Sequence, residues 1–517
     1  MTSAAPAATA STRAVPATTP GWLTKVRPAT AGRVLVLTAI ASAAADPVVD
    51  PDSFWHLATG KLILKTHVIP KSDPFSWTAP GRKWIAHEWL TEILFGLLHA
   101  VGRWPALVAY AVVTITFSWA IVAGTCRRLG AGAGWTNAIT LLAALSCLHT
   151  WGARPQMLSL LFGAIYADLF VRAWQGRPKQ LWWCVPIMLV WCNAHGGYMF
   201  GIASLLLFVC GLFAERVVRR ILPAMRSGAG AVSSDLFRHG LLALVATIAI
   251  SLANPNGVDG FLYPFSYLGD NASTRYIEEW FSPTFARLQW WPFFALLALG
   301  AVAVWKMRRS MPIYAMVGMA IYGALGIQSV RNITQFSFFA APFLALSLTA
   351  ASRAVRVKNA ANGRPPSSSP SAVSAVLPMA ALISAFGIGA LGLVNLAPQA
   401  TANAQAREFP TAASRYLGAN PTTNLYNQYD WGGYLLWSLK QPVGIDGRPD
   451  MYGDTFVDRY VATWNTRAGW EKDIERADVR SVLGRPDAPL VTKLRARTTS
   501  WRVAYEDRQA VLLVKLP

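Results

Sequence analysis

The sequence predicts an all-α polytopic membrane domain followed by a small C-terminal α/β domain outside the membrane. Of the 517 residues, 53% are hydrophobic and 14% are charged, which is unlike an ordinary soluble protein. Apolar runs such as 106–124, 290–305 and 376–396 approach the ~20 residues that a helix needs to cross ~30 Å of hydrocarbon. Such runs recur along the chain, so a single membrane anchor is excluded.

The N-terminal segment has a different composition. Residues 1–28 are rich in Ala, Thr, Ser and Pro, and the first apolar run begins only after Arg33. This is not the charged-then-apolar order of a cleavable signal peptide. We therefore expect residues 1–28 to form a disordered cytoplasmic tail.

The membrane domain, residues 29–396, is expected to contain about 11 transmembrane helices. Every predicted inner turn is basic, from Arg127 and Arg128 after the second span to Arg353 and Arg356 after the tenth. Lys and Arg in short loops mark the cytoplasmic side, so we expect a multi-pass protein of a cytoplasmic membrane with a cytoplasmic N terminus and an extracytoplasmic C-terminal domain. The predicted spans lie near residues 30–47, 104–125, 135–150, 155–173, 180–195, 198–214, 238–254, 290–305, 311–327, 334–351 and 376–396.

The first outer loop, residues 48–103, decides this topology. Apolar residues recur at near-helical spacing in segments 53–66 and 86–101, which predicts two helices lying along the membrane surface. If 86–101 crossed the membrane instead, the later basic turns would face outward, which is the less favourable solution. The loop itself contains several Lys and Arg residues, which favour that alternative.

Two polar regions lie outside the predicted spans and the first outer loop. Residues 353–375 include a Pro/Ser-rich stretch that predicts a flexible cytoplasmic linker between the last two spans. Residues 397–517 contain no run of spanning length. Short strand-like pieces at 423–426, 443–445 and 510–515 alternate with helical patterns such as 410–417, which predicts an α/β domain.

The net charge of +21 does not indicate a nucleic-acid partner, because the basic residues mostly fall in short clusters between apolar runs. Membrane lipids are the expected partners of these clusters. The five cysteines lie in or beside apolar runs without paired metal-ligand spacing, so the sequence predicts neither a disulfide framework nor a zinc site.

Titratable side chains concentrate in the first outer loop. Asp50 and Asp52 directly follow the first span, His56 lies one turn later, and His87 and Glu88 begin the second surface helix. Acids before a helix often satisfy its free backbone N–H groups, so a capping role remains open for each of these acids. Asp52 is the preferred catalytic residue because it immediately precedes the predicted surface helix, with Asp50 and Glu88 as further candidates.

This loop resembles that of the type-C glycosyltransferase superfamily, polytopic enzymes that take a sugar from a polyprenyl-phosphate carrier. In the superfamily, an essential acid and two membrane-parallel helices follow the first span, as Asp50, Asp52 and the two surface segments do here. Four further motifs are similar to a bacterial branch of it: Arg154-Pro155-Gln156, Trp191 to Gly197, Asn254 to Gly257 and Arg331-Asn332-Ile333. The resemblance implies the fold and a lipid-linked sugar donor.

A second resemblance lies in the C-terminal domain. The run from Tyr426 to Tyr434 is similar to the Trp-Trp-Asp-Tyr-Gly motif of oligosaccharyltransferase catalytic subunits, which binds the acceptor. The order around Asp430 and Trp431 differs, so recognition of a glycosylation sequon is not implied, and a glycine turn packed by aromatic rings is the alternative. Asp446 and Arg448 nearby either line the same cleft or form a salt-bridged loop.

Several other residues are candidates for substrate binding. A lipid-linked donor carries phosphate, which arginine can hold bidentately, so Arg331 and Arg154 are the expected cations at the outer headgroup level. Snorkelling to the interface is the alternative role for both. His195 lies at the same level and is either a ligand or a polar turn residue. His56 and His87 of the first outer loop are further candidates. Glu278 and Glu279 are candidates to hold the acceptor or a divalent cation, Mg²⁺ or Mn²⁺, unless they form a solvated face.

The expected function is transfer of a sugar from a polyprenyl-phosphate or polyprenyl-diphosphate donor to a glycan, lipid or protein acceptor at the outer face. Direct displacement by an acceptor hydroxyl would invert the anomeric carbon. Two alternatives remain: a transporter or flippase of a lipid-linked substrate, and a non-catalytic envelope-assembly protein. Transporters often show two related halves, and no such repeat is visible in this sequence.

Overall fold

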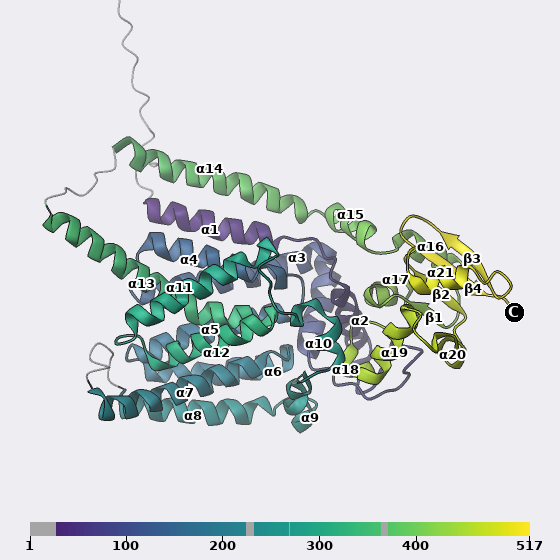
Figure 1. Cartoon of the computed structure of the whole chain (residues 1–517), viewed down its shortest axis with the longest axis horizontal. Coiled ribbons are helices and arrows are strands. Elements are labelled where there is room, and N and C mark those ends of the chain that lie inside the picture. The colour runs from purple at the N-terminus through teal and green to yellow at the C-terminus, as the bar shows by residue number, and fades with distance from the viewer. Residues whose placement is uncertain (1–26, 224–231, 268, 363–370) are drawn as a thin grey trace, which may run out of the picture.

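The computed structural model describes residues 27–223, 232–267, 269–362 and 371–517. Figure 1 shows an elongated helical bundle with a smaller C-terminal domain at one end. Within the described residues, each predicted span corresponds to one helix, which confirms the expected membrane fold. These helices are α1 (Pro28–Ala44), α3 (Trp89–Arg128), α4 (Ala133–Ser146), α5 (Gln156–Trp174), α6 (Cys184–Ala194), α7 (Tyr198–Ile221), α8 (Ser234–Ser251), α11 (Trp291–Met307), α12 (Ile313–Gln328), α13 (Ile333–Ala361) and α14 (Ser371–Asn395).

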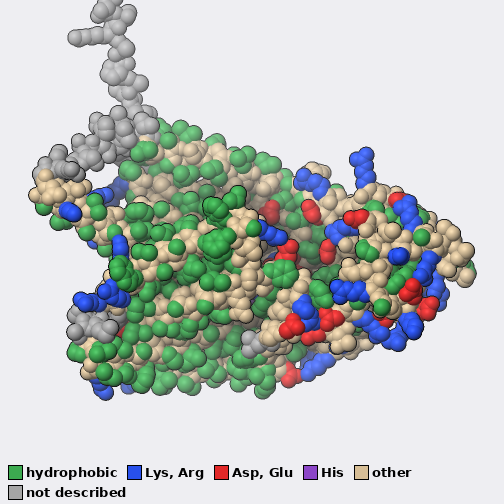
Figure 2. Space-filling model, in the orientation of Figure 1, with side chains coloured by type: hydrophobic (Ala, Val, Ile, Leu, Met, Phe, Trp, Pro, Cys, Tyr) green, Lys and Arg blue, Asp and Glu red, His purple; other side chains and the backbone are tan. Residues whose placement is uncertain are grey.

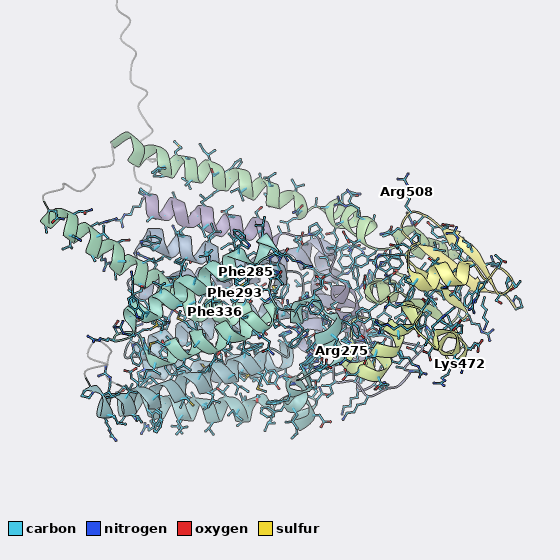
Figure 3. The ribbon with its side chains drawn as sticks, viewed as in Figure 1. Arg275, Phe285, Phe293, Phe336, Lys472 and Arg508 are labelled. Carbon is cyan, nitrogen blue, oxygen red and sulfur yellow. The ribbon has the colours of Figure 1, made fainter. Side chains whose placement is uncertain are left out.

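The bundle helices differ in length. Among the described residues, seven helical segments are long and apolar enough to cross a membrane, whereas α1 and α12 are apolar but shorter. Helices α4 and α6 have 14 and 11 residues, and a 3-10 helix, Pro178–Trp183, leads directly into α6. Inside the bundle the apolar faces interlock: Phe293 of α11 packs edge-to-face on Phe336 of α13, with ring centroids 5.8 Å apart (Figure 3).

Surface charge is distributed unevenly along the long axis of the molecule. Figure 2 shows hydrophobic side chains over the middle of the bundle, with Lys and Arg at the end far from the C-terminal domain. Helices α3, α7 and α11 all end in basic residues. This is the distribution expected if that end faces the cytoplasm.

The first outer loop folds into two helical arms at the outer end of the bundle. One is α2 (Pro51–Thr66), and the other is the first part of α3, which packs against α2. Arg103 interrupts α3 with φ 50° and ψ −143°, and Pro105 follows it, so the arm before Arg103 and the span after it are separate helical segments. Figure 1 places α2 between the bundle and the C-terminal domain.

The C-terminal domain is α/β, as expected. Its four strands form one sheet in the order β1-β2-β4-β3, with β1 and β2 parallel and the other pairs antiparallel. The strands are β1 (Leu425–Asn427), β2 (Ser481–Gly484), β3 (Trp501–Glu506) and β4 (Val511–Lys515). The helices are α15 (Pro398–Glu408), α16 (Thr411–Ala419), α17 (Gly432–Leu439), α18 (Pro449–Tyr452), α19 (Asp454–Trp464), α20 (Trp470–Arg476) and α21 (Pro489–Arg495).

One predicted strand is wrong. Residues 443–445 do not join this sheet, and Val443 instead makes an isolated parallel bridge to Ser76 of the first outer loop. Two backbone hydrogen bonds form this bridge. The Val443 N–H donates to the Phe75 carbonyl at 3.0 Å, and the Trp77 N–H donates to the Val443 carbonyl at 3.1 Å. The segment therefore ties the C-terminal domain to the loop.

The C-terminal domain and the first outer loop share one hydrophobic core. The Phe54 ring of α2 lies 5.0 Å from Phe409 and 5.3 Å from Tyr434 between ring centroids. An ion pair adds to this contact: Arg275, in α10 (Ala272–Tyr276), lies 2.8 Å from Asp458 of α19 (Figure 3). The domain is therefore packed onto the membrane domain rather than tethered beside it.

Two predicted segments are only partly described. Of the expected tail, residues 1–26 lie outside the described residues, and α1 begins at Pro28. Of the expected linker, residues 363–370 also lie outside them. Residues 353–361, which we placed in the linker, continue α13 instead.

Candidate active site

A cavity of about 620 Å³ lies between the C-terminal domain and the end of the bundle nearest to it. Its polar end is built from the first outer loop, the turn before α5, the turn before α7 and the loop before α11. Its acidic, basic, histidine and amide lining residues are Asp52, His56, His87, Glu88, Arg154, Gln156, His195, Glu279, Gln328, Arg331, Asn332 and Asp450.

Arg154 lies at the centre of the polar end. Its Nη2 is 3.0 Å from Asp52 Oδ2, its Nη1 is 3.2 Å from Asp50 Oδ2, and Nη1 also donates to Glu279. Asp50 and Asp52 come from the start of α2, whereas Glu279 comes from the 3-10 helix Glu278–Trp280. The guanidinium therefore joins three carboxylates from two distant parts of the chain, and these carboxylates hold the pKa of Arg154 above its ordinary value despite burial.

Asp50 and Asp52 have different roles in α2. Asp50 is the N-cap, because its Oδ1 accepts the Asp52 backbone N–H at 2.9 Å. Asp52 Oδ1 accepts instead from the Trp55 indole at 3.0 Å. Burial, followed by repulsion from Asp50, raises the pKa of Asp52 to about 7, although Arg154 and Trp55 oppose the shift. A carboxylate with such a pKa suits proton transfer near neutral pH.

Glu88 is the centre of a second cluster, which contains three histidines. Its oxygens lie 3.4 Å from His56 Nε2, 3.6 Å from His87 Nε2 and 3.4 Å from His195 Nε2. His195 Nδ1 accepts the Gly197 backbone N–H at 2.9 Å, so its proton is on Nε2 and points to Glu88. Burial lowers the pKa of His195 to about 4, so this ring is neutral.

His87 differs from His195 in the direction in which its pKa is shifted. Its Nδ1 lies 3.1 Å from the Ile85 carbonyl, to which it donates, while Nε2 faces Glu88. Burial alone would lower the pKa of His87, but the neighbouring Glu88 carboxylate outweighs burial and raises it. The histidines in turn hold the pKa of Glu88 below its usual range, so His87 and Glu88 form an ion pair.

His56, Glu88 and Glu92 are the residues that fit a metal ion best. Their candidate ligand atoms lie within 4.8 Å of one another, and all three side chains are buried. Glu92 Oε2 has no hydrogen-bond partner among the described residues. A mixed nitrogen and oxygen donor set favours Mn²⁺ over Mg²⁺, which prefers oxygen alone. Asp50, Asp52 and Glu279 fit a metal less well, because Arg154 already lies among them.

Arg331 and an apolar wall form the other side of the cavity. Arg331 Nε is 3.8 Å from Glu279 Oε2, and its guanidinium lies 5.0 Å from the Trp280 ring centroid. Tyr267 stacks on Trp280 with an interplanar angle of 11°. The apolar wall continues along α7 and α12 through Met199, Phe200, Ala203, Leu207, Ile321, Tyr322 and Leu325.

Eight of the 14 predicted site residues line this cavity. Asp50 contacts Arg154 without lining the cavity, and five others lie elsewhere. Glu278 is exposed outside it, and Asp430 pairs at the surface with Arg485 at 3.0 Å. Trp431 is buried in the core of the C-terminal domain. Arg448 forms fully buried ion pairs with Asp446 and Asp73. Of the two roles expected for Asp446 and Arg448, the structure therefore supports the salt-bridged loop. Asp430 therefore lies outside the cavity that Asp52 lines.

Sequence reasoning missed Asp450, Tyr263, Tyr267 and Trp280 as cavity residues. Asp450 lies in the same acidic stretch as Asp446, which was a usable signal. Tyr263 and Tyr267 are four residues apart and share a hydroxyl contact of 2.6 Å, which helical spacing could have suggested.

Two of three comparisons with known proteins found no match: no family model fits the sequence, and no curated protein matches it. Solved structures do match. The apo oligosaccharyltransferase of Archaeoglobus fulgidus has a TM-score of 0.53 and 12% identity, over 87% of this chain and 69% of that protein. ArnT from Cupriavidus metallidurans bound to undecaprenyl phosphate has a TM-score of 0.50 and 14% identity, over 93% of this chain and 96% of that protein.

The chain has the type-C glycosyltransferase fold. This confirms the fold that the resemblance of the first outer loop implied. At these identities the likeness establishes the fold alone, so the chemistry of the site must be argued from its own residues. The cavity of this chain lies where the helices of the first outer loop meet the C-terminal domain.

Proposed function

We propose that this protein transfers a glycosyl unit from a polyprenyl-phosphate or polyprenyl-diphosphate donor to an acceptor hydroxyl at the outer face of the membrane. The observation that carries the proposal is one cavity that combines a carboxylate with a pKa near 7, two arginines and an apolar wall that extends along the bundle helices. A soluble sugar donor would need no such wall.

The two sides of the cavity match the two parts of such a donor. The apolar residues of α7 and α12 suit an isoprenoid chain, and Arg331 at the end of that wall suits its phosphate. The similar structure of ArnT, which has the same fold, was solved with undecaprenyl phosphate bound, and this supports a carrier of that class.

In the proposed reaction, the acceptor oxygen attacks the anomeric carbon while the bond from that carbon to the phosphate oxygen breaks. The phosphate leaves with the bonding electron pair, and Arg331 stabilises its charge. The acceptor proton passes to Asp52, which is ionised above about pH 7 and oriented by Arg154 and Trp55. A single displacement of this kind inverts the anomeric carbon.

The proposal includes a site for a divalent cation. His56, Glu88 and Glu92 would hold it, and it would supply positive charge beside the donor phosphate. Asp52 and Arg154 act in the proposed reaction without contacting this cluster.

The test uses purified protein in lipid nanodiscs with undecaprenyl phosphate carrying radiolabelled glucose, mannose or N-acetylglucosamine, and with a bacterial envelope extract that supplies acceptor hydroxyls. We expect release of free undecaprenyl phosphate from at least one donor, and loss of this release in Asp52→Asn. Asp430→Asn is the matched control, because Asp430 is an acid outside the cavity. Movement of intact donor across liposome membranes without release would instead identify a flippase, and binding without either would indicate an assembly protein.

A further inference from the structure

We infer that the C-terminal domain positions the Asp52 carboxylate, through the backbone of Gly447 and the buried side chain of Arg448. The inference rests on the proposed function. It concerns residues 445–450, here called the positioning loop, which connect the sheet side of the C-terminal domain to the cavity.

Gly447 lies directly against Asp52. A Cβ atom added to Gly447 would be 2.0 Å from Asp52 Oδ1 and 3.0 Å from Trp55 Nε1. These two atoms are the partners of the hydrogen bond that fixes Oδ1. Glycine is therefore required here for close approach, and its backbone limits where the carboxylate can turn.

Arg448 anchors the positioning loop to the first outer loop. Its Nε donates to Asp446 Oδ1 at 2.8 Å, and its Nη2 donates to Asp73 Oδ1 at 2.8 Å. The guanidinium lies 4.5 Å from the Trp84 ring centroid and is 1% exposed. Asp73 belongs to the outer loop, so a buried charge network holds the two parts of the chain at a fixed separation.

A second contact fixes the other side of Asp52. A Cβ atom on Gly433 of α17 would be 2.3 Å from the Pro51 carbonyl oxygen. Pro51 stands between the two acids at the start of α2, so the C-terminal domain touches the backbone before Asp52 as well as its carboxylate. The contacts of Gly433 and Gly447 therefore hold the start of α2, which carries Asp52, at two points.

The consequence is that the C-terminal domain is part of the reacting site rather than an independent binding module. Asp52 Oδ2 is held by Arg154 and Oδ1 by Trp55, so a small shift of Gly447 would turn the carboxylate away from the acceptor. A misplacement of about 1 Å can cost on the order of 100-fold in rate. Gly447 and Arg448 are thus positioning residues, and Asp52 remains the residue that touches the acceptor.

The decisive variant is Gly447→Ala. The atom in its way is the end of the Asp52 side chain rather than backbone, so the carboxylate should move while the fold remains. We expect turnover of the undecaprenyl-linked donor to fall on the order of 100-fold, with undecaprenyl phosphate affinity and melting temperature near wild type. Gly418→Ala is the control, because a Cβ there would meet nothing within 4 Å.

A double-mutant cycle separates positioning from a general structural effect. If Gly447 acts through Asp52, then Gly447→Ala should cause little further loss in an Asp52→Asn background. Arg448→Lys keeps the charge but loses the two-pronged contact of the guanidinium with Asp446. The loss of turnover that it causes should likewise vanish in the Asp52→Asn background. Wild-type turnover from Gly447→Ala, or losses that multiply with Asp52→Asn, would overturn the inference. A wild-type protein that turns over no donor would instead overturn the proposed function.

Discussion

Arg154 Nη2 lies 3.0 Å from Asp52 Oδ2, and the same guanidinium contacts Asp50 and Glu279. Three carboxylates this close would repel one another strongly in a buried site without a cation among them. Arg154 supplies that cation from within the chain. The turn before α5 therefore assembles the start of α2 and the loop before α11 into one site.

Removing Arg154 should affect both stability and activity. Arg154→Ala leaves Asp50 and Asp52 without their cation and Glu279 with Arg331 alone, and we expect the free energy of unfolding to fall on the order of 3 kcal/mol. Arg154→Lys keeps the charge but not the fork, so its loss should be smaller. Arg485→Ala breaks an exposed pair with Asp430 and should cost at most ~1 kcal/mol. Equal melting temperatures for Arg154→Ala and Arg485→Ala would contradict this account.

The pH dependence of transfer should report Asp52. Its pKa is raised to about 7, so the carboxyl is protonated and inactive as a base below that pH and becomes ionised above it. Turnover should therefore rise through about pH 7 and then level off. Initial rates measured at fixed ionic strength test this, with Asp430→Asn expected to keep the same profile. A rate that stays constant down to about pH 5 would remove Asp52 as the base.

The spans were predictable because apolar length is a local property of the sequence, and α5, α7 and α14 lie close to their predicted ranges. The outer-loop acids were predictable for a similar reason, since Asp52 follows a span directly. The strand β2 has four residues, all buried, and so shows no alternation that a sequence could reveal.

The site residues of the C-terminal domain depended on tertiary contacts. Asp430 and Asp446 look alike in sequence, yet one pairs at the surface with Arg485 and the other is buried with Arg448. The contact of Gly447 with Asp52 joins residues far apart in the chain. Nothing local to either residue indicates that contact, because it depends on how the domain docks on α2.

Breaking the Arg448 network should loosen the C-terminal domain. Arg448→Met leaves Asp73 and Asp446 buried without their cation, and we expect a loss of about 3–5 kcal/mol. Arg508→Ala, an exposed side chain of the same domain (Figure 3), should change little. Thermal unfolding and limited proteolysis between the outer loop and the domain measure the effect. Unchanged protease resistance in Arg448→Met would show that the network is dispensable.

Binding of a divalent cation should depend on Glu92. We expect purified protein to bind Mn²⁺ at His56, Glu88 and Glu92, and Glu92→Gln to weaken this binding by about 10- to 100-fold. Electron paramagnetic resonance titration measures free Mn²⁺ directly. Glu278→Gln is the control, since that acid is exposed outside the cavity. Equal titration curves for the two variants would place the ion elsewhere.

Topology can be tested without any substrate. Reporters fused after Arg128, Arg220 and Arg309 should be cytoplasmic. Arg128 and Arg220 lie in the last turns of α3 and α7, and Arg309 follows α11. Lys and Arg gather at the end of the bundle far from the C-terminal domain (Figure 2). Fusions after Asn271 and Pro398 should be extracytoplasmic. Alkaline phosphatase activity at the first three sites would invert the proposed orientation.

The most direct test of the central claim is donor turnover by Asp52→Asn beside wild type, in nanodiscs, with melting temperature recorded on the same samples. Asparagine keeps the shape of the side chain but cannot take a proton. We predict that turnover falls by ~100- to 10,000-fold while the melting temperature and undecaprenyl phosphate affinity stay near wild type. Near-normal turnover in Asp52→Asn would contradict the account.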